Sequence, residues 1–159
     1  MALTPGGGRA PSAPPPPRPA RDLRDRPPAP AAALSALRWG VLVGGLLIIA
    51  DLTTRLILQR AGQEAGDTLA GIDEAVNALL LVTAGMSVQR ETGRVMWAAL
   101  AGLVAGLLDG LVIAAANSIN PPPGPQDPLG LLLQNVAQGP IVAVAAAFIS
   151  SVLRRRAGP

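Results

Sequence analysis

Four long runs of apolar residues follow one another along the chain, and short polar connections separate them. A helix needs about 20 residues to span the hydrocarbon core of a bilayer, and each run is long enough. A segment in lipid must satisfy its own backbone hydrogen bonds, as a helix does. The pattern predicts transmembrane helices over residues 34–58, 68–88, 95–117 and 129–153.

Short connections force consecutive helices to run in opposite directions. The expected fold class is therefore all-α: a polytopic membrane protein with four transmembrane helices in an antiparallel bundle. The last connection is rich in proline and ends at Asp127, which is placed to cap the fourth helix. Pro128 follows at the first helical position, where proline is favoured.

The first 33 residues have a different composition from the rest of the chain. They hold ten of the 17 prolines and five arginines, with almost no large apolar side chains. Such a segment buries too little surface to offset the entropy lost on ordering. We expect residues 1–33 to be a disordered cytoplasmic tail, acting either as a solvated tether or as a contact for anionic lipid head groups.

The arginines predict how the helices are oriented, because cytoplasmic loops carry the excess of basic residues. Eleven arginines fall on one side of the predicted membrane, and the other side has only Arg60, plus Arg55 near the end of the first predicted helix. The basic C-terminus, residues 154–159, includes Arg154, Arg155 and Arg156 as interface anchors. Trp39 and Trp97 would lie at the same interface. Both termini are expected to be cytoplasmic, and the Arg-only, Ala- and Gly-rich composition indicates a bacterial inner-membrane protein.

An offset of 58 residues aligns the first predicted hairpin with the second. The offset pairs Trp39 with Trp97, Leu42 with Leu100, Gly44 with Gly102, Asp51 with Asp109, and Asn77 with Asn135. A duplicated helical hairpin explains these matches, and parallel repeats occur in transporter folds. Chance matches among common residues are the alternative explanation. In either case the two aspartates lie at the same depth, just beyond the membrane midplane.

Polar side chains gather in the outer half of all four predicted helices. The cluster consists of Asp51, Arg55, Asp73, Glu74, Asn77, Asp109, Gln134, Asn135 and Gln138. Asp51 and Arg55 are four residues apart, a spacing that allows an ion pair along one helix. An intramembrane ionisable residue usually faces the bundle interior and marks a functional site. The alternative is that the cluster serves only as interhelical hydrogen bonding.

Glycines line one face of the first and third predicted helices. Gly40 and Gly44 share the face of Asp51, and the stripe of Gly102, Gly106 and Gly110 has Asp109 at its edge. Glycines at this spacing let a neighbouring helix approach closely. Gly139 and Pro140 predict a kink in the fourth helix, since proline removes one helical hydrogen bond.

The composition excludes most catalytic chemistry. The chain has no Lys, His, Cys or Tyr, so it lacks the usual metal ligands, thiolates and general bases. We therefore expect no enzyme activity, no cofactor and no metal site. The basic tail lacks the aromatic residues that stack on bases, so nucleic acid is not an expected partner.

Two functions remain after these exclusions. The glycine and alanine stripes favour a small accessory protein embedded in the lipid bilayer. It would assemble as a homo-oligomer or within a larger membrane complex. The intramembrane acids favour the alternative, a small transporter or an ion or proton pathway.

Overall fold

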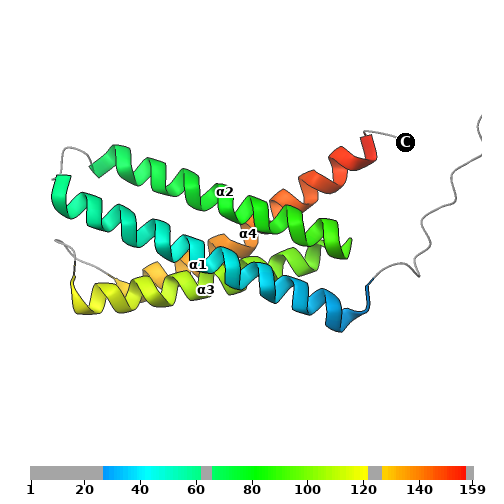
Figure 1. Ribbon diagram of the computed structural model, residues 1–159, viewed down its shortest axis with the longest axis horizontal. Helices are drawn as coiled ribbons and strands as arrows, with labels where there is room; N and C mark the ends of the chain where they lie inside the picture. The colour runs from blue at the N-terminus through cyan, green and yellow to red at the C-terminus, as the bar shows by residue number, and fades with distance from the viewer. Residues whose placement is uncertain (1–26, 62–65, 122–126, 157–159) are drawn as a thin grey trace, which may run out of the picture.

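The computed structural model describes residues 27–61, 66–121 and 127–156, and within them the chain forms four α-helices. They are α1 (Ala29–Ala61), α2 (Gly66–Thr92), α3 (Val95–Ile119) and α4 (Pro128–Arg156). All four are long and apolar enough to cross a membrane. Figure 1 shows the helices lying lengthwise beside one another, with the last turns of α4 diverging from the other three.

The helices are longer than the apolar runs that predicted them. α1 begins at Ala29 and not at residue 34, so the last five residues assigned to the tail are helical. Pro30 lies in the first turn, where a missing backbone N–H breaks no helical bond. At the other helix ends the backbone continues into polar residues, because helical hydrogen bonds do not require apolar side chains. Residues 1–26, the main part of the predicted tail, lie outside the described residues.

The start of α4 follows the predicted capping pattern. The backbone N–H of Leu129 donates to Oδ1 of Asp127 at 3.2 Å. The backbone carbonyl of Asp127 accepts the first helical bond, from the N–H of Leu131 at 3.0 Å. Asp127 therefore satisfies one of the donors that every helix leaves free at its first turn.

Each helix contacts two or three others. α1 packs on α2 and α3, α4 packs on α2 and α3, and α2 also contacts α3. Across the described ranges no contact joins α1 to α4. The third helix has the largest buried share of the four, and the first and second have the smallest.

The core is made mostly of small side chains. One cluster comprises Val43, Leu47, Leu81, Ala84 and Ala105, and a second comprises Ala36, Val88 and Ala101. Large apolar side chains such as Leu34, Leu79 and Ile141 are exposed instead, each by more than half of its surface. A water-soluble protein usually buries its large apolar side chains. The arrangement suits helices that pack closely on one another and turn their large residues toward lipid.

Candidate functional site

All four helices contribute polar side chains to one cavity of about 410 Å³. The cavity lies in the half of the bundle that holds the end of α1, the start of α2, the end of α3 and the start of α4. Its lining includes all nine residues expected to form the polar cluster: Asp51, Arg55, Asp73, Glu74, Asn77, Asp109, Gln134, Asn135 and Gln138. Residues far apart in sequence are thus brought together at one depth.

Two hydrogen bonds join α1 to α2 along one side of the cavity. The amide of Asn77 donates from Nδ2 to Oδ1 of Asp51 at 2.8 Å. One turn further along, the hydroxyl of Thr54 donates to Oδ1 of Asp73 at 2.8 Å. Thr54 was missed in the sequence, where only its position on the Asp51 face distinguishes it from other threonines. These bonds hold the two carboxylates in place beside the cavity.

The second hairpin repeats the first of these bonds. Nδ2 of Asn135 in α4 donates to Oδ2 of Asp109 in α3 at 2.9 Å. The donor and acceptor are separated by 26 residues in this pair, as they are in the Asn77–Asp51 pair. Each hairpin thus offers an aspartate from its first helix and an asparagine from its second.

The most deeply buried polar residue of the cavity is Asp109. Its side chain is only 4% exposed, and its Oδ1 atom is buried without a hydrogen-bond partner. Oδ1 of Asn77 is buried and unpartnered as well. Glu74 and Gln134, which also line the cavity, are exposed. The cavity therefore opens toward these two residues and ends at a buried carboxylate.

Apolar residues close the cavity on its inner side. Leu47 and Leu81 line it and also belong to the main core cluster, where they are almost fully buried. The second core cluster, around Ala36 and Val88, lies further along the bundle. The polar residues of the cavity are consequently separated from the far end of the bundle by packed apolar side chains.

Arg55 does not form the expected ion pair with Asp51. Its Nη2 donates to Oδ1 of Asn117 in α3 at 2.6 Å. The first and third helices run side by side, which brings Asn117 within reach, while Asp51 already accepts from Asn77. Asn117 is 3% exposed and was not among the predicted residues. The helix-to-helix register that brings it near Arg55 has no signature in the sequence.

The charge around the cavity is unbalanced. Four acids and one arginine line it. Asp51 from α1 and Asp109 from α3 both line this one cavity. Carboxylates that share one cavity repel each other, and a cation or a proton bound in the cavity relieves the repulsion. Within the described helices, no three His, Cys, Asp or Glu side chains are grouped as metal ligands.

The glycine stripes lie against helices of the same chain. An added Cβ at Gly102 would lie 2.3 Å from the carbonyl oxygen of Gly139, and one at Gly106 would lie 2.3 Å from that of Asn135. Such positions admit glycine alone, because the opposing atom is backbone. Three further glycines make similar approaches: Gly40 and Gly44 to α3, and Gly110 to Leu132 in α4.

The fourth helix stays helical on both sides of Gly139 and Pro140. Gly139 marks the place where α4 meets α3 most closely, since a Cβ there would lie 2.2 Å from the carbonyl oxygen of Gly102. The proline thus follows directly on the crossing point of the two helices. Its neighbour Gly139 serves the packing of α3 on α4.

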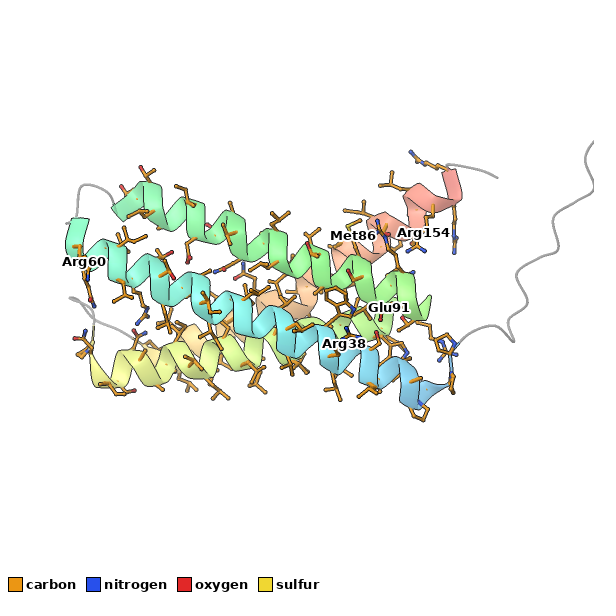
Figure 2. The ribbon with its side chains drawn as sticks, in the orientation of Figure 1. Arg38, Arg60, Met86, Glu91 and Arg154 are labelled. Atoms are coloured by element: carbon orange, nitrogen blue, oxygen red, sulfur yellow. The ribbon has the colours of Figure 1, made fainter. Side chains whose placement is uncertain are left out.

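The far end of the bundle carries the tryptophans and most of the described arginines. Trp39 and Trp97 both pack against the Ala36 cluster, and Nε1 of Trp39 donates to Oε1 of Glu91 at 2.9 Å. Glu91 also accepts from the hydroxyl of Ser35. Arg154, Arg155 and Arg156 are exposed there. Figure 2 shows Arg38, Glu91 and Arg154 toward this end and Arg60 at the other.

No protein-family model, curated protein or solved structure matches the chain.

Proposed function

We propose that the chain is an integral protein of a bacterial inner membrane. Its four helices would cross the bilayer as an antiparallel bundle, with both termini in the cytoplasm. The length of the helices and their exposed leucines and isoleucines support insertion. The hydrogen-bonded pairs support the antiparallel order, because residue numbers rise along α1 as they fall along α2.

Within this bundle, the proposed function is uptake of a cation from the outer side of the membrane, as a small transporter or an ion pathway. The observation that carries the proposal is the cavity itself, where all nine residues of the predicted polar cluster converge. Four acids against one arginine favour a cation over an anion. Isolated polar contacts between helices would not require a shared cavity of about 410 Å³.

The matched hydrogen bonds also support a duplicated hairpin. Chance similarity of Leu and Gly would align apolar positions, but it would not reproduce an Asn-to-Asp bond with the same sequence separation in both halves. In transporters built from repeats, the binding site lies between the repeats near the membrane midplane. Asp51 and Asp109 occupy such a position in the proposed arrangement.

An accessory or oligomerising subunit was the first expectation from the sequence, and the packing weakens its motivation. The glycines that suggested an association surface contact other helices of the same chain. Because these glycines already contact helices of the same chain, they are not evidence for a second protein. We therefore still propose a non-enzymatic membrane protein, and we propose cation uptake as its role in place of assembly.

Purified protein reconstituted into vesicles tests the proposal. We expect a cation or proton flux above that of empty vesicles, strongly reduced by Asp109→Asn and by Asp51→Asn. Asp67→Asn is the matched control, because Asp67 is an exposed acid at the start of α2 that does not line the cavity. The absence of any flux from wild-type protein, or equal flux from all three variants, would overturn the proposal.

A further inference from the structure

Two acceptor atoms in the cavity lack a donor. Oδ1 of Asp109, in α3, and Oδ1 of Asn77, in α2, are both buried and unpartnered among the described residues. A buried acceptor without a partner is unfavourable, because it has lost its hydrogen bonds to water. Both residues line the cavity, so an occupant that carries N–H groups can satisfy them.

Three donor groups that line the cavity bond to other side chains. Nδ2 of Asn77 donates to Asp51, and Nδ2 of Asn135 donates to Asp109. The guanidinium of Arg55 donates to Asn117. None of these three bonds reaches Oδ1 of Asp109 or Oδ1 of Asn77, so both acceptors are open to a donor from an occupant of the cavity.

Apolar side chains stand next to these acceptors. Leu47, Leu81 and Ile113 line the cavity and are each less than 7% exposed. Neither tryptophan, nor Phe148, is among the lining residues. The cavity thus combines acceptor oxygens with aliphatic walls, and it lacks the aromatic faces that recognise quaternary ammonium groups.

We propose that this cavity binds a small primary ammonium cation with a short aliphatic body. The N–H groups donate to Asp109 and Asn77, the positive charge lies near Asp51 and Asp109, and the aliphatic part lies against the leucine and isoleucine walls. This inference rests on the proposed cation uptake and names its substrate class. Ammonium groups supply three donors each, whereas a quaternary ammonium supplies none.

Binding to the purified full-length protein in lipid nanodiscs tests the substrate class. Calorimetric titrations with propylammonium, tetramethylammonium and sodium chloride compare cations with donors, without donors and without an aliphatic part. We expect propylammonium to bind about tenfold or more tightly than either of the others. Equal binding of tetramethylammonium would overturn the role of the donors, and equal binding of sodium would assign the site to an inorganic cation.

Two variants locate the site once the ligand series is known. Asp109→Asn is expected to weaken propylammonium binding about tenfold or more, because it removes the deepest charge. The Asp67→Asn control should bind as wild type. Unchanged binding to Asp109→Asn in well-folded protein would overturn the site. If the Asp109→Asn variant does not fold, the three titrations of wild-type protein alone decide whether the cavity selects a primary ammonium cation.

The outcome also separates this inference from the function on which it rests. Selective propylammonium binding without any flux would retain the site and overturn cation uptake. Flux of cations through vesicles without ammonium selectivity would retain cation uptake and overturn the substrate class.

Discussion

Glycine at the crossing of α3 and α4 is a steric requirement. An added Cβ at Gly106 would lie 2.3 Å from the carbonyl oxygen of Asn135. Neither backbone can yield without moving its whole helix. These residues set the distance between the helices and, with it, the position of Asp109 relative to Asn135.

We therefore expect Gly106→Ala to destabilise the protein by about 1–3 kcal/mol, the usual range for overpacking. Gly45→Ala is the matched control, since an added Cβ at Gly45 meets nothing within 4 Å. Thermal unfolding in detergent measures both. Similar midpoints for the two variants would show that the α3–α4 contact is looser than described.

The two Asn–Asp pairs have the same chemistry but differ in burial. Asp109 is 4% exposed, whereas Asp51 is only half-buried. Removing a hydrogen bond costs more where water cannot replace it. The buried pair should consequently contribute more to stability than its counterpart in the first hairpin.

We expect Asn135→Ala to lower stability by about 1–2 kcal/mol and Asn77→Ala to lower it by about half as much, in line with hydrogen bonds measured in membrane bundles. Unfolding in mixed micelles by denaturing detergent gives both values. Because the substitutions are identical, each variant is the control for the other. A larger loss from Asn77→Ala would contradict the assigned depths.

The positions of the helices and the residues of the polar cluster could be predicted from the sequence. The hydrogen-bond partners of individual side chains could not. Hydropathy gives the four helices, and the shared depth of the polar residues gives the cavity lining. The Arg55–Asn117 bond depends on how α1 is shifted along α3, which no periodicity records. Similarly, the glycine stripes indicate close approach, but their partner helix could not be named.

The register of α1 against α2 can be tested with cysteines, because the chain has none of its own. The Thr54 hydroxyl and the Asp73 carboxylate are 2.8 Å apart, so both side chains point at each other. We expect the Thr54→Cys, Asp73→Cys pair to form a disulfide on mild oxidation more readily than a pair shifted along α1, because the two side chains face each other.

A shifted pair provides the control for this register. Leu52→Cys with Asp73→Cys moves one thiol by about 200° around α1, onto an exposed face. Non-reducing electrophoresis after proteolysis between the helices reports each link. Equal yields from the two pairs would mean that α1 and α2 are arranged differently from the description.

The two ends of the bundle differ in charge and in packing. The cavity end carries Arg55 and Arg60 among the described arginines, and the far end carries Arg38, Arg90, Arg94 and the C-terminal arginines. Apolar core clusters lie between them. If the cavity faces outward, as the arginine distribution predicts, cations enter from outside and meet a closed core before the cytoplasm.

Orientation is tested by labelling single cysteines in intact cells. We expect a membrane-impermeant thiol reagent to label Arg60→Cys, at the end of α1, without permeabilisation. Arg156→Cys, at the end of α4, should react only after the membrane is opened, because positive residues stay in the cytoplasm. The cysteine-free wild type gives the background. The reverse labelling pattern would place the cavity mouth in the cytoplasm, and the direction of the proposed uptake would then have to be reversed as well.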